Sequence, residues 1–152
     1  MELKRAERRH HLATRDYARL AAFRHSLRRF LRFSEEAAAA DGITGQHYQA
    51  MLILRACPEG QRTTINDLAQ QLLIKHNSAV ELVDRLEKRN LVKRERSDVH
   101  RSFVFVRITK TGEMMLRKLV ASRKADLQVA GPILVKALTT LTKQQAKQKK
   151  DK

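Results

Sequence analysis

Residues 64–90 read TINDLAQQLLIKHNSAVELVDRLEKRN and contain two short helical patterns separated by a tight turn. Thr64 and Asp67 stand three residues apart, which is the spacing of an N-terminal capping box with Asp in place of the usual Glu. The helix that they open has an apolar face formed by Ile65, Leu68, Ala69 and Leu72. Only residues 73–75 separate it from a second helical pattern over 76–89. Such a pair is a helix-turn-helix pattern, although many all-helical domains also contain one.

The residues that follow the pair strengthen this interpretation. Asn90 ends the second helix, because Asn tolerates the left-handed conformation at a helix end. Residues 91–96 and 103–108 are predicted to be strands, and the polar residues 97–102 form the tip that joins them. A single hairpin placed directly after a helix-turn-helix predicts a wing.

Helices are also predicted before this region. A long helix begins at Thr14 and stops near Gly42, which can take the left-handed conformation that ends a helix. Thr44 can cap a second helix, which ends before Pro58. The apolar stripe of the long helix consists of Leu20, Phe23, Leu27, Phe30 and Leu31.

After the wing, Thr109 can cap a further long helix. We expect an interruption at Gly131-Pro132, because proline breaks a helix interior, and an apolar stripe beyond it. The segment 143–152 has one apolar residue and is predicted to be a frayed basic tail, and 1–13 a basic arm. The second stripe consists of Ile133, Leu134, Ala137, Leu138 and Leu141.

These patterns predict a mainly α-helical single domain, 1–152, with one β-hairpin wing. Residues 44–112 form a winged helix-turn-helix lobe, and 14–42 with 113–142 form a helical dimerisation lobe. The apolar stripes exceed what one neighbouring helix needs to cover, so we expect a homodimer about a two-fold axis. The predicted dimer interface contains Leu20, Phe23, Leu27, Phe30, Leu31, Leu127, Ile133, Leu134 and Leu138.

Charge narrows the choice of partner. The chain has 32 Lys and Arg against 16 Asp and Glu, a net charge of +16. Such a charge opposes compact folding by self-repulsion unless a polyanion offsets it. Nucleic acid is therefore the favoured partner, and an anionic membrane surface and the ribosome are the alternative partners. No stretch approaches the ~20 consecutive apolar residues of a membrane span, and Cys57 is the only cysteine, so we expect a cytoplasmic protein.

Catalytic and metal-binding patterns are not found in the sequence. We see no nucleophile–base pair, glycine-rich phosphate loop or carboxylate constellation, so an enzyme is not expected. The six histidines lack ligand spacing, and no metal or cofactor is expected.

Four fragments in this order resemble the MarR (multiple-antibiotic-resistance regulator) family. They are Thr64–Ala69, Val83–Lys88, Leu91–Arg94 and Ile108–Gly112. The resemblance implies a dimer with interlaced terminal helices, a recognition helix in the major groove and a wing at the minor groove. It also implies a possible small organic ligand between the two lobes. Cys57 is expected to be a buried structural thiol, and a peroxide-sensing role, which some relatives in the family give to a reactive cysteine, is the alternative.

Comparison with the family pattern also marks a departure in the wing. His100 stands where the family usually has an aspartate before the wing arginine, here Arg101. A histidine cannot hold that arginine as a carboxylate would, although Asp98 could substitute.

Candidate DNA-binding residues lie on the second helix and on the wing. In the helix, Ser78 and Glu81 could instead form a capping box, and Arg85 could pair with Glu81. In the wing, basic residues could simply protect exposed strand edges. The recognition-helix candidates are Lys75, His76, Asn77, Ser78, Glu81 and Arg85, and the wing candidates are Lys93, Arg94, Arg96, Arg101 and Arg107.

The sequence as a whole favours a sequence-specific, double-stranded DNA-binding transcription regulator. We expect a MarR-type homodimeric repressor that binds an inverted repeat and responds to a ligand. Two other functions stay open: a sequence-blind architectural or ribosome-associated protein, and a helical adaptor that binds a protein partner.

Overall fold

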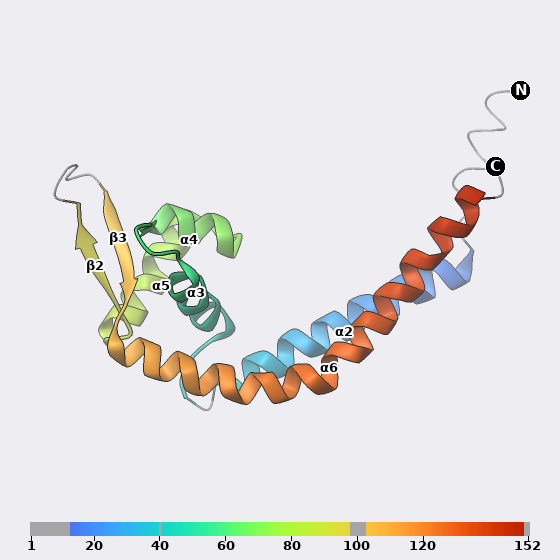
Figure 1. The fold of residues 1–152 in the computed structure, drawn as a ribbon, viewed down its shortest axis with the longest axis horizontal. Coiled ribbons are helices and arrows are strands. Elements are labelled where there is room, and N and C mark those ends of the chain that lie inside the picture. The colour runs from blue at the N-terminus through green and yellow to red at the C-terminus, as the bar shows by residue number, and fades with distance from the viewer. Residues whose placement is uncertain (1–12, 40, 98–102, 151–152) are drawn as a thin grey trace, which may run out of the picture. The chain divides into compact units, whose positions relative to one another are not determined.

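The computed structural model describes residues 13–39, 41–97 and 103–150 (Figure 1). Within these residues the chain forms two compact units. Met1–Phe33 and Asp126–Lys152 make up what we call the helical unit, and Ser34–Ala125 make up the winged-helix unit. The elements are, in chain order, α2 Thr14–Ala39, α3 Gly45–Ala56, β1 Thr63–Thr64, α4 Ile65–Leu72, α5 His76–Lys88, β2 Val92–Arg96, β3 Val104–Ile108 and α6 Lys110–Lys150.

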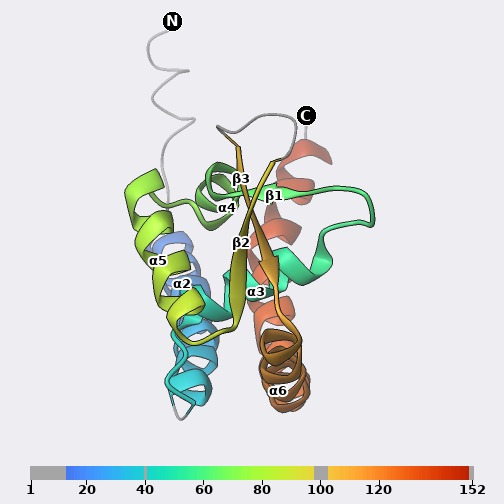
Figure 2. The ribbon, with the colours of Figure 1, turned by 90° about the vertical axis from the view of Figure 1, so that its left-hand side faces the viewer.

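The winged-helix unit contains the predicted hairpin and one additional short strand. Strands β2 and β3 pair antiparallel, with Val92 opposite Ile108. Strand β1, which precedes α4 directly, adds to the other edge of β3 with Thr63 opposite Val106, so the sheet order is β1-β3-β2 (Figure 2). The predicted fold class is confirmed, and β1 was not predicted.

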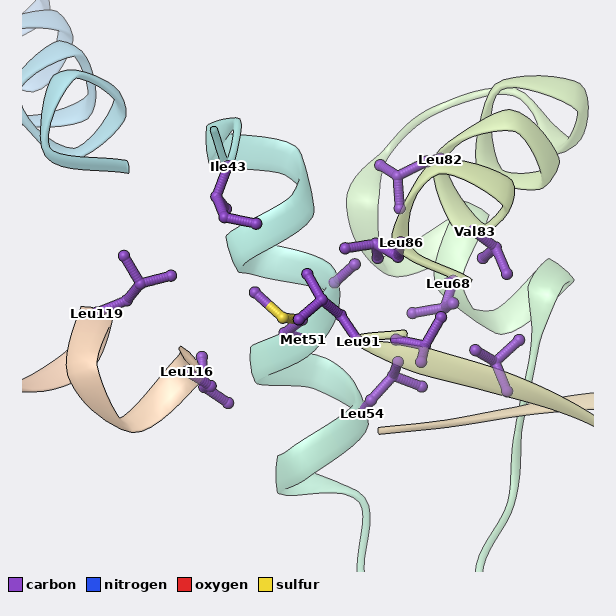
Figure 3. Close-up of a cluster of buried hydrophobic side chains, with 13 residues drawn as sticks. Ile43, Met51, Leu54, Leu68, Leu82, Val83, Leu86, Leu91, Leu116 and Leu119 are labelled. Atoms are coloured by element: carbon purple, nitrogen blue, oxygen red, sulfur yellow. The ribbon is translucent and has the colours of Figure 1, made fainter. Parts of the chain in front are cut away.

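Helix α3 lies at the centre of the hydrophobic core (Figure 3). Its Met51 is fully buried, and apolar side chains from the other helices and the sheet pack around it. Among them, Leu68, Val83 and Leu86 belong to the apolar helix faces expected from the helical periodicity. The side chains that Figure 3 labels around Met51 are Ile43, Leu54, Leu68, Leu82, Val83, Leu86, Leu91, Leu116 and Leu119.

Local caps define the starts and ends of these helices as the sequence predicts. The Thr64 hydroxyl accepts from the backbone N–H of Asp67, whose carboxylate accepts from the N–H of Thr64. Thr44 caps α3 in the same manner, with the Nδ1 atom of His47 in the reciprocal role. Gly42 and Asn90 have the positive φ angles, 67° and 56°, that the two helix ends require.

The start of α6 is pressed against the end of α5. The Thr109 hydroxyl accepts from the N–H of Gly112 and donates to the carbonyl of Asn90, while the Thr109 N–H donates to the carbonyl of Leu91. A Cβ added at Gly112 would lie 2.0 Å from the Leu91 carbonyl oxygen. The glycine of the Ile108–Gly112 fragment is therefore required by a close backbone approach.

The helical unit consists of the first part of α2 and the last part of α6, which run in opposite directions (Figure 1). Helix α6 continues through Pro132 to Lys150. The predicted interruption at Gly131-Pro132 is therefore wrong, and the backbone of 143–150 is helical rather than frayed. Pro132 has no N–H, so the carbonyl four residues earlier loses its hydrogen bond within the helix. Because Pro132 is exposed, water can bind that carbonyl instead, and the helix continues.

Candidate nucleic-acid interface

Helix α5 has one buried face and one exposed face. Ala79, Leu82, Val83 and Leu86 pack into the core. The residues expected to contact DNA lie elsewhere on the helix and its N-cap, and all are exposed: Lys75, His76, Asn77, Ser78, Glu81 and Arg85. The structure therefore groups all six on the solvent side of one helix.

The first turn of α5 differs from the alternative in which Ser78 caps it. The helix begins at His76, its N-cap is Lys75, and no side chain caps it. The prediction that Ser78 and Glu81 form a capping box is thus wrong, whereas the predicted Arg85–Glu81 ion pair is present at 3.5 Å. The N-terminal amide groups of α5 remain available for another acceptor, and phosphate is the acceptor that such helix ends favour.

The wing presents a basic surface that contains a carboxylate. Lys93, Arg96 and Arg107 are exposed. The ammonium of Lys93 lies 2.6 Å from the carboxylate of Glu95 and the guanidinium of Arg107 lies 3.5 Å from it. The hydrogen bond from Lys93 is the main reason that the pKa of Glu95 lies below its usual value. Three further residues of the predicted tip, Asp98, His100 and Arg101, lie outside the described residues.

Arg94 is held differently from the other candidates. Its guanidinium contacts the carboxylates of Asp84 and Glu87 and the carbonyl of Val80, all on α5, and the Glu87 carboxylate also accepts from the Arg94 N–H. Burial opposes the charge of Arg94, but the hydrogen bonds to Glu87 and Asp84 outweigh it and raise its pKa. Arg94 therefore joins the wing to α5 and is not turned toward a ligand.

A second basic residue ties the end of α5 to the turn before α3. The guanidinium of Arg89 donates to the carbonyls of Asp41 and Gly42, at 2.9 and 2.7 Å. The Asp41 carboxylate in turn binds Lys118 of α6 at 2.7 Å. The sequence predicted neither contact, because the partners of Arg89 are 47 and 48 residues away and no local spacing indicates them.

His47 lies beside these groups. Its side chain is buried, and its Nδ1 atom accepts the Thr44 N–H, so the ring must be unprotonated at that nitrogen. Burial, followed by the charges of Arg85 and Arg89, lowers the pKa of His47. The capping role explains why a histidine stands in the core.

Two further basic side chains of this unit make cation–π contacts. Arg123 of α6 stacks over Tyr48 at 3.8 Å, and Arg62 stacks over Phe105 at 5.1 Å. Burial raises the pKa of Tyr48, and the charge of Arg123 opposes that shift. Both arginines therefore secure the fold around α3 and the sheet.

A hollow of about 840 Å³ adjoins the exposed face of α5. Its lining comes from the end of α2, the first turn of α3 and α5, and includes Ile43, His47, Ser78, Leu82 and Arg85. Cys57, which follows α3, is half-buried and lies away from this hollow.

Metal-binding clusters and membrane spans are both absent from the part of the chain that the structure describes. Within it, no three His, Cys, Asp or Glu residues are grouped so that they could hold a metal ion. None of its helices combines the length and the apolar character that crossing a membrane requires.

Comparison with known proteins identifies this arrangement. Residues 41–101 match the sequence model of the MarR family, which confirms the resemblance for the winged-helix region. The structure is similar to AbsC, a MarR family transcriptional regulator from Streptomyces coelicolor, with a TM-score of 0.74 and 21% identity over 93% of this chain and 98% of that one. No curated protein matches the chain.

Two other solved structures share the fold. MepR, a transcription regulator of the Staphylococcus aureus multidrug efflux pump MepA, has a TM-score of 0.60 and 17% identity, covering 85% of this chain and 88% of that one. The apo form of MarR from E. coli has a TM-score of 0.58 and 19% identity, covering 77% and 79%. At these identities the likeness shows the fold alone.

Proposed function

We propose that the chain is a transcription regulator that binds duplex DNA through α5 and the wing, because residues 41–101 match the sequence model of the MarR family. The observation that carries this proposal is the exposed face of α5, which presents an amide, a hydroxyl and a guanidinium from a rigid helix. Asn77 can pair bidentately with adenine and Arg85 with guanine, so these two side chains are proposed to read bases in the major groove.

Phosphate contacts would position that helix. Lys75 and Ser78 lie at the uncapped N-terminus of α5, where backbone amides and the helix dipole favour an anion. On the wing, Lys93, Arg96, Arg107 and Arg101 are proposed to follow the minor groove, whose negative potential attracts arginine. Arg94 is left out of the contacts because α5 already holds its guanidinium.

The regulator is proposed to act as a homodimer. Leu20, Leu31, Leu127 and Ile133 of the helical unit are each about half exposed in the single chain, which is unusual for large apolar side chains on two helices of one unit. A second copy would cover them. Two α5 helices on a two-fold axis would read an inverted repeat with half-sites about 34–36 Å apart, and occupying such a site in a promoter would repress transcription.

The regulator is also proposed to respond to a small ligand. The hollow beside α5 combines apolar walls with Arg85 and Ser78 on the helix proposed to read DNA. An aromatic carboxylate bound there would compete for the Arg85 guanidinium and so lower the affinity for the operator. Titration of aromatic acids against operator binding tests this, and a set in which none weakens the complex would contradict it.

One experiment tests the central proposal. Duplexes are selected from a random library by the wild-type protein, and affinities are then measured for the selected and for a random duplex. Asn77→Ala should lower the affinity for the selected duplex by about 1–3 kcal/mol and leave the random duplex nearly unchanged. Asn66→Ala, on the exposed surface of α4, is the matched control and should preserve the preference. Equal losses on both duplexes for Asn77→Ala would contradict base reading by α5.

A further inference from the structure

The net charge is unevenly divided between the two units. The helical unit contains 16 Lys and Arg against 5 Asp and Glu in 60 residues, so it contributes +11 of the total +16. The winged-helix unit contains 16 basic and 11 acidic residues in 92, which leaves +5. The unit that is proposed to read DNA therefore carries less than a third of the excess charge, and binding through α5 and the wing does not account for the rest.

The basic side chains of the two units also differ in their partners. In the winged-helix unit, at least nine Lys and Arg side chains bind a carboxylate, a backbone carbonyl or an aromatic ring. In α2, the exposed side chains of Arg24, Arg28 and Arg29 have no ion pair with any residue that the structure describes. Asp16 is the only acidic residue between positions 14 and 33, and it pairs with Arg19.

The three arginines are placed together by the helix. Arg24 and Arg28 are four residues apart and therefore lie on the same face, one turn or about 6 Å along the axis. Arg29 follows Arg28 and lies about 100° farther round the helix, and Arg32, four residues after Arg28, continues the row by a further turn. The apolar stripe of Leu20, Phe23, Leu27, Phe30 and Leu31 occupies a neighbouring sector of the helix. Arg24, four residues after Leu20, borders this stripe, and Arg28 and Arg29 lie farther round the helix. A partner that covers the stripe therefore leaves Arg28 and Arg29 exposed, with Arg24 at the edge of the covered surface.

A row of like charges at this spacing destabilises an isolated helix, and only an anionic partner turns that repulsion into a favourable interaction. Guanidinium groups bind phosphate oxygens bidentately, and a duplex presents phosphates continuously along its length. Duplex DNA is also the ligand proposed for the other unit of the same chain, so it would be present at high effective concentration. In this respect the inference rests on the proposed function.

We propose that Arg24, Arg28 and Arg29 of α2 form a second DNA-binding surface, which binds the phosphate backbone without regard to sequence and is separate from α5 and the wing. The surface adds affinity for any duplex and leaves the preference for the operator to α5. Its contribution falls steeply with salt, because each neutralised phosphate releases condensed counterions.

The test removes the row from the full-length protein. A variant with Arg24→Gln, Arg28→Gln and Arg29→Gln is compared with a matched variant that loses the same charge from exposed positions of α6 in the winged-helix unit, Lys110→Gln, Arg117→Gln and Lys124→Gln. Affinity for a random duplex is measured across a salt series. The row variant should bind at least about tenfold more weakly at low salt, and its slope of log affinity against log salt should become shallower by about 0.9 for each phosphate that is no longer neutralised.

Several outcomes would overturn the proposal. One is an unchanged slope of log affinity against log salt in the row variant, and another is an equal change of that slope in the matched variant. A third is weaker binding of the row variant to phosphatidylserine vesicles without weaker binding to DNA, which would assign the row to a membrane surface. Circular dichroism and light scattering establish that both variants keep the helices and the oligomeric state. The random duplex reports on the row alone, and the preference for the selected duplex reports on α5, so failure of one proposal is distinguishable from failure of the other.

Discussion

The winged-helix unit and the helical unit use the same kinds of side chain in opposite ways. In the first, Met51, Leu68 and Val83 are fully buried, and basic residues such as Arg94 bind carboxylates. In the second, Leu20, Leu31 and Ile133 remain about half exposed, and the described side chains of Arg24 and Arg28 have no acidic partner. The winged-helix unit therefore satisfies many of these side chains internally, whereas the helical unit leaves apolar and basic side chains exposed. Four predictions test this contrast, from the largest expected effect to the smallest.

The exposed leucines of α2 should matter for association. Leu27→Asp with Leu31→Asp should raise the dimer dissociation constant by about 10³, because four side chains per dimer lose roughly 1 kcal/mol each of remaining apolar burial. Light scattering over a concentration series measures the change. Ala21→Asp with His25→Asp adds the same charges on the other side of α2 and should leave the dimer intact. Dissociation by both pairs, or by neither, would contradict an interface on the leucine face.

Two glycines of α6 should respond in opposite directions to the same substitution. Gly112→Ala places a methyl group against the Leu91 carbonyl and should destabilise the winged-helix unit by about 3 kcal/mol. Gly131→Ala meets nothing within 4 Å and should be neutral or stabilise α6 by about 0.5–1 kcal/mol, because alanine favours the helix. Urea unfolding measures both, and similar effects at the two positions would disprove the close approach.

Replacing an arginine that has partners should destabilise the protein more than replacing an exposed basic residue. Arg94→Gln leaves Asp84 and Glu87 without their cation and should lower the free energy of unfolding by about 1–2 kcal/mol, a value reduced because both carboxylates are partly exposed. Lys93→Gln on the same strand should change it by less than about 0.5 kcal/mol. Urea unfolding gives the comparison, and amide exchange in α5 should rise only in Arg94→Gln. Equal effects of the two variants would mean that the bonds from Arg94 to α5 contribute little.

The smallest effect concerns pH and His47. Its pKa is lower in the folded protein than the usual 6.5, so between the two values the unfolded chain binds more protons. The stability that His47 contributes is fully present above pH 6.5 and is lost as the pH falls toward the lowered pKa. His47→Gln can keep the capping box, because its side-chain oxygen accepts the Thr44 N–H, and should weaken this pH dependence. Identical unfolding profiles of variant and wild type between pH 7 and 5 would exclude the contribution.

Much of the winged helix could be predicted because its signals are local. The capping box of Thr64 and Asp67, the positive φ angles of Gly42 and Asn90, and the hairpin after α5 each depend on residues within a few positions of one another. Such signals act before tertiary contacts form, so they are readable in the chain itself. The four family fragments lie mostly within this same region, and the match over 41–101 reflects it.

Features that the sequence did not predict, or predicted wrongly, depended on distant or permissive surroundings. Nothing local indicates that Thr63 and Thr64 pair with β3, which is some 40 residues away. The tight turn after α4 is made by Leu73 at a φ of 55°, a conformation usually left to glycine or asparagine, and only the surrounding fold imposes it. Helix α6 passes through Pro132 because the local penalty is small at an exposed position.

By itself, the sequence determined most of the helices, the caps at Thr44, Thr64 and Thr109, the hairpin and the excess of positive charge, because periodicity, capping and composition are properties of neighbouring residues. Only the tertiary structure decided which charges have partners: Arg94 and Arg89 bind groups outside their own segments of the chain, whereas Arg24, Arg28 and Arg29 meet no acidic side chain among the described residues. The reason is that an ion pair depends on the distance between two charges in space and not on their separation in the sequence. An arginine therefore stabilises the fold, or stays available for a ligand, according to which groups the fold brings within a few ångströms of it.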